Sequence, residues 1–414
     1  VSLVGSEMCI RDRAEAVQLV GAIGLDVVHA ESVAFYKPRA NTFLGSGYVD
    51  RIAELAEEAD HPLIVVNAGL SPVQQRNLET GTGCKVIDRT ALILEIFGAR
   101  AQTHAGRLQV ELAAMTFQRS RLVRSWTHLE RQRGGGGFLG GPGERQIELD
   151  RRMLMDRVVR IKRELKDVER TRHLQRGNRS RGEVPTVALI GYTNAGKSTL
   201  FNRLTGAGVL SKDMLFATLD PTMRAVTLPS GRRIVLADTV GFISQLPTEL
   251  VEAFKSTLEE VVQADLLLHV HDAASPLVAE EAEDVRAVLV DLGIDEEQQD
   301  ERLLSVMNKS DLLEGQDPAR EALGNLFDEG CFTSALDGDG IDTLLAAIDR
   351  RLGKDRRTEN LVLGPADGAA RAWLHEHGEV IASRMGEAGD EMLEVAMDAA
   401  DWARFGARWP ALAG

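Results

Sequence analysis

The sequence predicts an α/β protein: a small parallel α/β domain, a long antiparallel helical hairpin, a larger α/β domain with a phosphate-binding loop, and a small α+β C-terminal appendage. Three observations support this fold class. Short branched apolar runs alternate with helical patterns, heptad spacing extends over residues 108–175, and a glycine-rich loop follows a strand pattern at residues 186–190. The chain of 414 residues is 44% hydrophobic and 27% charged, which is an ordinary globular composition.

The N-terminal part of the chain divides into two stretches. Residues 1–13 do not resemble the start of a domain, and we expect them to be a non-native leader. From residue 14 to 107, strand and helix patterns alternate. The apolar runs at 25–28 and 63–66 are rich in branched residues, which is typical of buried strands. This alternation predicts a small parallel α/β domain.

Two helix starts are marked within this domain. Ser71 precedes Pro72, and proline at the first helical position loses no hydrogen bond that the helix needs. Asp88 can cap a further helix that ends near Gly98. Nothing in the domain forms a catalytic constellation.

Residues 108–182 carry two heptad seams. Apolar side chains repeat every three or four positions over 108–129 and again over 147–168, and Arg119 and Arg151 interrupt the two patterns. The spacing predicts two long helices packed as an antiparallel hairpin.

The tip of this hairpin is rich in glycine. Seven of the ten residues 134–143 are glycine, and arginines flank them. We interpret the tip as a probe that enters a cavity lined by RNA; the alternative is a plain linker. The candidate contact residues are Arg131, Arg133, Gly134, Gly135, Gly136, Gly137, Phe138 and Arg145.

The charge of the chain is unevenly distributed. The net charge is −15, yet residues 119–181 hold 18 basic against 8 acidic side chains. This excess indicates that one part of the molecule binds an anionic partner. The alternative is a charged helix that is simply exposed to solvent. The three scattered cysteines exclude a disulfide scaffold and fit the cytoplasm. No apolar run is long enough for a membrane helix, and no pattern indicates an oligomer.

A phosphate-binding loop opens the larger α/β domain, residues 183–353. A buried strand pattern leads into the motif G-x-x-x-x-G-K-S, and a helix pattern follows it. The loop amides and the helix N-terminus would hold phosphates, Lys197 would reach the β and γ phosphates, and the Ser198 hydroxyl would bind Mg²⁺. The nucleotide-binding candidates here are Gly191, Tyr192, Thr193, Asn194, Ala195, Gly196, Lys197, Ser198 and Thr199.

Three further motifs follow in order, each at the end of a predicted strand. Asp238-Thr239-Val240-Gly241 offers a carboxylate that can hold Mg²⁺ through water and a glycine amide for the γ-phosphate. Asn308-Lys309-Ser310-Asp311 offers a carboxylate for the ring N–H and amine of guanine, which adenine does not match. Ser334 and Ala335 supply amides toward the guanine O6. Together they predict a domain that binds and hydrolyses GTP, with GDP as product.

A threonine that senses the γ-phosphate must lie between the phosphate loop and Asp238. The candidate stretch is Phe216-Ala217-Thr218-Leu219-Asp220. We favour Thr218 as the Mg²⁺ ligand of the GTP state, with Thr222 as the alternative. Loops of this kind are ordered by the γ-phosphate and released on hydrolysis.

The group that activates the attacking water is not evident. Many GTPases place a glutamine after the Asp-x-x-Gly motif, but here that position is Phe242. Intrinsic hydrolysis should therefore be slow. Asn194 could help to bind K⁺ beside the phosphates, or it could only form hydrogen bonds within its own loop.

The last residues, 354–414, mix short apolar runs with an alanine-rich helical pattern, which predicts the α+β appendage. His375 and His377 do not share a helix face, so they are not a metal pair. His269 and His271 share a strand face, but no third ligand is nearby.

Several of these segments resemble the HflX family of ribosome-associated GTPases. The resemblance covers about residues 43–351 and is loose after 355. Two residues depart from the family pattern: Arg145, where Thr or Ser is expected, and His271, at a strand position that is usually apolar. The matching segments are 108–113, 126–132, 140–144, 150–152, 216–220 and 246–250.

The resemblance implies a bacterial protein that binds the large ribosomal subunit, including its rRNA, and splits stalled or idle ribosomes under the control of GTP. In the family the hairpin enters the subunit interface, and its tip approaches the peptidyl transferase centre. It also implies that the ribosome stimulates hydrolysis. Two alternatives stay open: a GTPase of RNA modification or ribosome maturation, and an RNA-remodelling module that uses ATP through its N-terminal domain.

Overall fold

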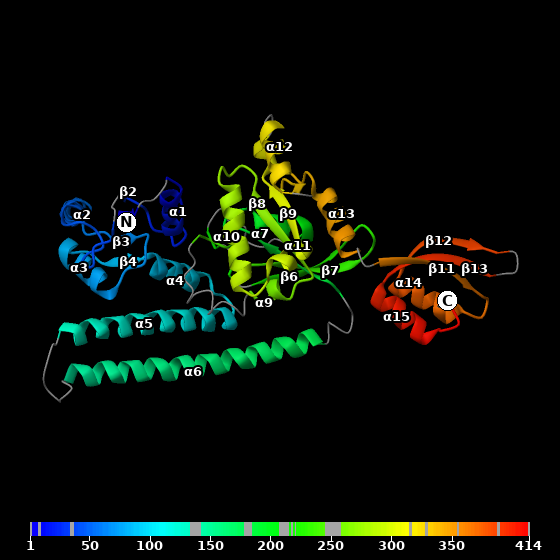
Figure 1. Cartoon of the computed structure of the whole chain (residues 1–414), viewed down its shortest axis with the longest axis horizontal. Helices are drawn as coiled ribbons and strands as arrows, with labels where there is room; N and C mark the ends of the chain where they lie inside the picture. The colour runs from blue at the N-terminus through cyan, green and yellow to red at the C-terminus, as the bar shows by residue number, and fades with distance from the viewer. Residues whose placement is uncertain are drawn as a thin grey trace.

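A computed structural model gives the fold of the chain. It describes residues 2–6, 10–33, 37–132, 142–177, 184–206, 215–216, 218–219, 221–244, 258–313, 317–327, 330–353, 356–386 and 390–412. Figure 1 shows an N-terminal α/β domain, two long helices beneath it, a central α/β domain and a C-terminal α+β domain. The predicted fold class is confirmed. The predicted boundary at 182/183 falls outside these ranges, and the one at 353/354 falls at the end of the range 330–353; both stay predictions.

The N-terminal domain is built on a parallel sheet with the order β2-β1-β3-β4. Its helices follow the strands in the chain, as expected for parallel pairing. The elements are β1 (Ser2–Ser6), α1 (Ile10–Gly21), β2 (His29–Val33), α2 (Ser46–Glu58), β3 (Ile64–Val66), α3 (Pro72–Thr82), β4 (Val86–Asp88) and α4 (Arg89–Arg100).

Two expectations for this domain need comment. The strand expected at 25–28 is wrong: the strand that pairs with β1 is β2, and Val28 just before it is 63% exposed. A short apolar run alone does not fix where strand pairing begins. The structure also places β1 inside the sheet, although it lies within the stretch 1–13 that we set apart. That this stretch is a non-native leader stays a prediction.

The predicted helix starts are confirmed. Ser71 caps α3 by accepting from the Gln74 amide at 3.2 Å, and the Gln74 side chain accepts from the Ser71 amide at 2.9 Å. Asp88 caps α4 by accepting from the Ala91 amide at 2.8 Å. Helix α4 continues past Gly98 to Arg100.

The hairpin consists of α5 (His104–Gln132) and α6 (Pro142–Gly177), which lie side by side in Figure 1. The predicted seam is confirmed where side chains are described, and Glu111 pairs with Arg157 across it at 2.7 Å. Residues 133–141, which include Arg133, Gly134–Gly137 and Phe138, lie outside the described residues, as do the side chains of Arg131 and Arg145. The buried seam residues are Leu108, Leu112, Val158, Ile161 and Leu165.

The central domain has a sheet with the order β10-β9-β8-β5-β7-β6, in which only β6 is antiparallel to its neighbour. The carboxyl ends of its parallel strands meet at one edge, where ligands bind in such sheets. Its elements are β5 (Thr186–Ile190), α7 (Lys197–Thr205), β6 (Thr222–Thr227), β7 (Arg233–Asp238), α9 (Glu259–Val262), β8 (Leu266–Asp272), α10 (Val278–Asp291), α11 (Glu296–Arg302), β9 (Leu303–Asn308), the 3-10 helix η2 (Ser310–Leu313), α12 (Asp317–Leu326), β10 (Cys331–Phe332) and α13 (Ile341–Leu352).

The C-terminal domain packs two helices on a three-stranded antiparallel sheet of order β11-β13-β12. Its strands are β11 (Arg356–Leu363), β12 (Glu379–Met385) and β13 (Glu391–Asp398), and its helices are α14 (Gly368–His377) and α15 (Ala399–Arg408). Leu363, Leu374, Val395 and Phe405 are fully buried between them. Within the ranges that the structure covers, no helix could span a membrane and no side-chain group could hold a metal through three His, Cys, Asp or Glu residues.

One apolar core joins the N-terminal domain to the central domain. It combines residues of α1 and α4 with residues that flank the phosphate loop and the Asp-x-x-Gly motif. The two domains therefore fold against each other as well as each on its own sheet. Members of this core include Leu19, Val20, Ile93, Ile96, Phe97, Tyr192, Phe216, Val240, Phe242 and Ile243.

Candidate nucleotide-binding site

The phosphate loop connects β5 to α7 and requires both of its glycines. Gly191 has φ 144°, and a Cβ there would lie 2.2 Å from the Val270 carbonyl oxygen. Gly196 has φ 90°, and a Cβ there would lie 2.2 Å from Asn308 Nδ2. Only glycine combines these backbone angles with such close approaches. The spacing of the motif thus follows from the geometry of the loop.

Lys197 lies inside the loop at the start of α7. Its Nζ donates to the carbonyls of Gly191 at 3.0 Å and Tyr192 at 2.7 Å. Burial lowers the pKa of Lys197 to about 8, and the nearby Asp238 carboxylate acts in the opposite direction. A buried ammonium held only by carbonyls can exchange them for phosphate oxygens without moving far.

Three predicted metal ligands meet beside Lys197. The hydroxyls of Ser198 and Thr218 both donate to Asp238 Oδ2, at 2.7 and 2.9 Å, and they lie 2.9 Å from each other. Asp238 Oδ1 is buried and has no partner among the described residues. Thr222, the alternative to Thr218, instead begins β6 and pairs in register with Asp238.

This oxygen cluster fits Mg²⁺. Two hydroxyls and a carboxylate are hard oxygen donors of the kind that Mg²⁺ binds. A buried carboxylate oxygen without a partner is costly unless a cation or water completes it. Burial raises the pKa of Asp238, and hydrogen bonds from Ser198 and Thr218, together with the charge of Lys197, oppose the rise.

The Asp-x-x-Gly segment is tied to the phosphate loop through its backbone. The Thr193 amide donates to the Phe242 carbonyl at 2.7 Å, and the Phe242 amide donates to the Gly191 carbonyl at 3.1 Å. A Cβ on Gly241 would lie 2.8 Å from Thr193 Cγ2, so the two segments touch. The Phe242 ring is 1% exposed in the shared core. The ring therefore lies in the apolar core and is not exposed to solvent.

The guanine-recognition loops lie at the ends of β9 and β10. Asn308 Nδ2 donates to the Ala195 carbonyl at 2.9 Å, and Asn308 Oδ1 accepts from the Ala335 amide at 3.0 Å. Asn308 thus joins the phosphate loop to Ala335. Lys309 Nζ pairs with Asp272 at 2.7 Å, and Asp311 lies in η2.

Sequence reasoning missed Arg203 and Asp272. Arg203 of α7 donates from Nε to the Ala335 carbonyl at 3.0 Å, so it holds the loop of Ser334 and Ala335 in addition to Asn308. Asp272 ends β8 and fixes Lys309. Both belong to segments that the motifs do not include, and only the strand order brings them to the site.

The remaining candidates are distributed as follows. Tyr192, Thr193, Ala195, Thr239, Val240 and Ser334 are buried around the site, and Thr193 Oγ1 has no partner among the described residues. Asn194 has a left-handed backbone, with φ 62°. Phe216 and Leu219 are buried, whereas Ala217 and Asp220 lie outside the described residues.

Comparison with known proteins agrees with this geometry. Residues 11–98 match the family model described as GTP-binding GTPase N-terminal, residues 100–179 match GTP-binding GTPase Middle Region, and residues 186–309 match 50S ribosome-binding GTPase. Each model matches a segment of a different one of the three parts that precede the C-terminal domain.

Whole-chain relatives extend the match. GTPase HflX of Magnetococcus marinus is 50% identical over 93% of this chain and 88% of its own length. GTPase HflX of Escherichia coli is 44% identical over 97% of this chain and 93% of its own. The crystal structure of SsGBP with GDP covers 84% of this chain and 97% of that one, with a TM-score of 0.48 and 22% identity. On the identity and coverage of the two HflX relatives, the chain belongs to the HflX family of GTPases and is a GTP hydrolase.

Proposed function

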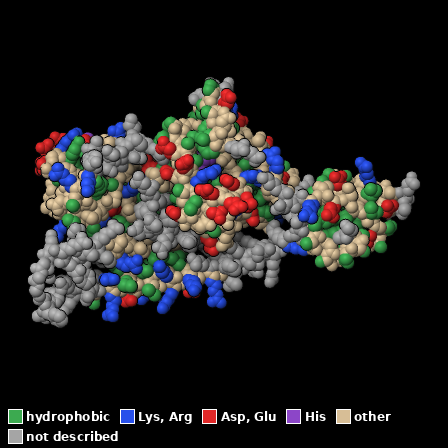
Figure 2. Space-filling view, viewed as in Figure 1, with side chains coloured by type: hydrophobic (Ala, Val, Ile, Leu, Met, Phe, Trp, Pro, Cys, Tyr) green, Lys and Arg blue, Asp and Glu red, His purple; other side chains and the backbone are tan. Residues whose placement is uncertain are grey.

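We propose that this GTPase binds the large ribosomal subunit through its hairpin and dissociates stalled or idle ribosomes in a GTP-dependent manner. Its work would then be in the cytoplasm. The observation that carries the proposal is a cationic face on α6 in a chain whose net charge is −15. Figure 2 shows Lys and Arg side chains along the hairpin and Asp and Glu over the central domain. The exposed basic residues are Arg151, Arg152, Arg160, Lys162, Arg163, Lys166 and Arg170.

Such a face suits structured RNA. Basic side chains that neutralise phosphates release counterions, so the affinity is independent of sequence and falls steeply with salt. Double-stranded RNA is recognised mainly by its shape and backbone. One side of α6 is used for the seam with α5, and the exposed residues on its opposite side are available to a partner. The glycine-rich tip, with Arg131, Arg133 and Arg145, would extend the same surface.

Within the GTP site we assign roles to the chain's own residues. Lys197 holds the β and γ phosphates, and Asp311 selects guanine while Lys309 lies along the base. Ser198 and Thr218 would hold Mg²⁺ directly and Asp238 through water. When bound, Mg²⁺ would neutralise charge on the phosphates. The cluster of Ser198, Thr218 and Asp238 described above supports this set.

We also propose that water activation does not come from the position after the Asp-x-x-Gly motif. The burial of the Phe242 ring supports slow intrinsic hydrolysis and a requirement for help from elsewhere. Asn194, which makes no side-chain hydrogen bond with a described residue, is the candidate ligand for K⁺. Hydrolysis measured in KCl and in NaCl tests this, because equal rates would remove the cation proposal.

The main test is sedimentation of ribosomes in a sucrose gradient with the protein and a non-hydrolysable GTP analogue. We expect ribosomes to separate into subunits. Deleting residues 134–143 should leave GTP binding intact and abolish the separation. Reversing the charge of Arg131, Arg133 and Arg145 should weaken binding and flatten its salt dependence. Arg350→Glu, an exposed arginine of α13, is the matched control and should change neither.

The result also separates the alternatives. Separation of subunits that persists without residues 134–143 would refute the role of the tip. Binding to the large subunit without separation would favour a role in ribosome maturation or RNA remodelling. No binding at any salt concentration would refute the proposal as a whole.

A further inference from the structure

We propose that α4 couples the GTP site to the hairpin, with Arg89 and Glu15 acting as positioning residues for the nucleotide loops. The proposal rests on the nucleotide site assigned above. Two consecutive residues at the start of α4 carry it: Asp88 contacts the hairpin, and Arg89 contacts the central domain.

Arg89 connects two segments of the N-terminal domain to the central domain. Its guanidinium donates to Asn67 Oδ1 at 2.6 Å, to Glu15 Oε1 at 2.6 Å and to the Ser244 carbonyl at 2.9 Å. Arg89 and Glu15 are only 5% and 8% exposed. Ser244 follows Gly241 by three residues, so the N-terminal domain holds the segment that would meet the γ-phosphate. Charge-assisted bonds in a buried setting fix such a segment firmly.

Glu15 extends the same cluster to the phosphate loop. Its Oε2 accepts from the Tyr192 hydroxyl and lies 3.3 Å from Ser244 Oγ, while the Ser244 amide donates to the Tyr192 hydroxyl oxygen at 2.9 Å. Burial and the adjacent negative charge of Glu15 raise the pKa of Tyr192 to about 12, so its proton stays in place for Glu15. Tyr192 is the second residue of the phosphate loop. The buried Glu15 carboxylate thus holds both the phosphate loop and the segment after the Asp-x-x-Gly motif, which are two of the three segments around the proposed metal cluster.

The segment that contains Thr218 is the third one around the proposed metal cluster, and it contacts the C-terminal end of α4. Phe97 packs edge-to-face on Phe216, with ring centroids 4.7 Å apart and planes at 82°. Phe216 lies two residues before Thr218. Between the two ends, Ile93 and Ile96 of α4 share the core with Val240 and Phe242. All three loops around the proposed metal cluster therefore contact the N-terminal domain.

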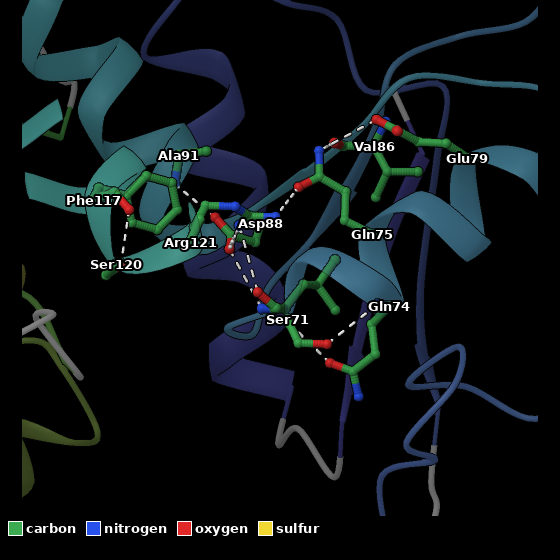
Figure 3. A network of polar contacts seen from close by, with 11 residues as sticks. Ser71, Gln74, Gln75, Glu79, Val86, Asp88, Ala91, Phe117, Ser120 and Arg121 are labelled. Atoms are coloured by element: carbon green, nitrogen blue, oxygen red, sulfur yellow. Dashed lines mark hydrogen bonds and ion pairs between the residues drawn. The ribbon is translucent and has the colours of Figure 1, made fainter. Parts of the chain in front are cut away.

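On its other side, α4 is held to the hairpin (Figure 3). Asp88 Oδ2 accepts from Arg121 Nη1 of α5 at 3.1 Å and from the Leu70 amide at 3.4 Å, and Asp88 is 2% exposed. Arg121 also donates to Gln75 Oε1 of α3. Ala113 and Phe117 of α5 pack against the core that contains α4. The hairpin is thus tied to the residue that caps α4.

A displacement of the nucleotide loops would move α4, because packed helices shift as rigid bodies instead of deforming. The hairpin would follow through Asp88 and Arg121. The coupling must be reciprocal in binding free energy: a partner on the hairpin that prefers one position of α4 changes the affinity for the nucleotide by the same factor.

Hydrogen exchange of the full chain with GDP, and then with a non-hydrolysable GTP analogue, tests the coupling. In the wild type we expect exchange of the α4 and α5 amides to differ between the two nucleotides. Arg121→Gln should keep the response in α4 and lose it in α5. Arg89→Gln should lose the response in both and raise the dissociation constant of the GTP analogue at least about fivefold, the lower end of typical coupling factors.

Two arginines serve as matched controls. Arg100 lies on α4 and donates to the Ala22 carbonyl within the same domain, and Arg157 pairs with Glu111 within the hairpin. Arg100→Gln and Arg157→Gln should keep the nucleotide response of α4 and α5. Tyr192→Phe removes only the hydroxyl shared by Glu15 and Ser244, and it provides a second variant if Arg89→Gln does not fold.

The outcomes are distinct. The coupling would be overturned if the nucleotide-dependent difference in α5 exchange persisted in Arg121→Gln, Arg89→Gln and Tyr192→Phe. It would also be overturned if the two control variants lost this difference equally. Wild-type protein that binds both nucleotides without any difference in α4 or α5 would overturn it as well. A wild type with no preference for guanine nucleotides would instead refute the proposed nucleotide site.

Discussion

Raising the pH should weaken the binding of guanine nucleotides through Lys197. Burial lowers the pKa of Lys197 to about 8, because it disfavours the charged form. Phosphates favour the protonated ammonium, so the pKa rises when nucleotide binds. Affinity should therefore be constant well below pH 8 and fall as the pH rises through 8.

The magnitude follows from this pKa. At about pH 7 roughly nine-tenths of Lys197 is protonated, and at about pH 8.5 roughly one quarter is. The dissociation constant should rise about fourfold between these values, which corresponds to about 0.8 kcal/mol. A lysine at its ordinary pKa near 10.4 would give almost no change over this range.

The assay is a titration with a fluorescent guanine nucleotide at constant Mg²⁺ and ionic strength. Lys197→Arg is the matched control, because arginine keeps its charge throughout this range. Its affinity can differ from that of the wild type, but it should not depend on pH. Equal wild-type dissociation constants at both pH values would refute the reasoning, and so would a fourfold change that persists in Lys197→Arg.

Three further predictions concern residues around the site. Burial, together with the charge of Arg286, lowers the pKa of His271 to about 3, so its stabilising contribution is present above pH 6.5 and is lost as the pH falls toward 3. Burial also lowers the pKa of His269, so both the wild type and His271→Leu should lose stability between about pH 7 and pH 5. In urea unfolding the loss should be about 2 kcal/mol larger in the wild type than in His271→Leu, and equal losses in both proteins would contradict this. Phe242→Gln should lower stability by about 3 kcal/mol in thermal unfolding without accelerating hydrolysis, since the side chain occupies the core; faster hydrolysis would contradict the buried position. Gly196→Ala should weaken nucleotide binding by at least about tenfold, measured by the same titration, because its Cβ displaces Asn308; Gly206→Ala, also at positive φ but in open space, is the control, and equal effects would refute the steric explanation.

The site was largely predictable because its residues occur in short motifs at strand ends. The carboxyl ends of parallel strands share one edge, so β5, β7 and β9 bring Ser198, Asp238 and Asn308 together once the strands are recognised. The preference for Thr218 over Thr222 agrees with the hydroxyl contacts in the structure. Heptad spacing predicted the hairpin equally well, because a heptad pattern of this length is compatible with few arrangements other than packed helices.

Other features could not be predicted. The cluster of Glu15, Arg89, Tyr192 and Ser244 joins positions up to 229 residues apart, and no local pattern marks any of them. The strand expected at 25–28 is displaced to β2 because pairing with β1, and not apolarity alone, decides which residues form it. His269 and His271 share a strand face as expected, with ring centroids 3.9 Å apart, but their polar character does not suggest that both are buried.

The shared core restricts how the molecule can be divided for experiments. A fragment of residues 184–353 would retain every nucleotide motif, yet Phe216, Val240, Phe242 and Ile243 would lose their covering from α1 and α4. Water would then reach a contiguous apolar patch, the kind of surface that makes recombinant fragments aggregate. Expression of the GTPase domain alone therefore calls for polar replacements on this patch or for keeping residues 14–100 in the same polypeptide.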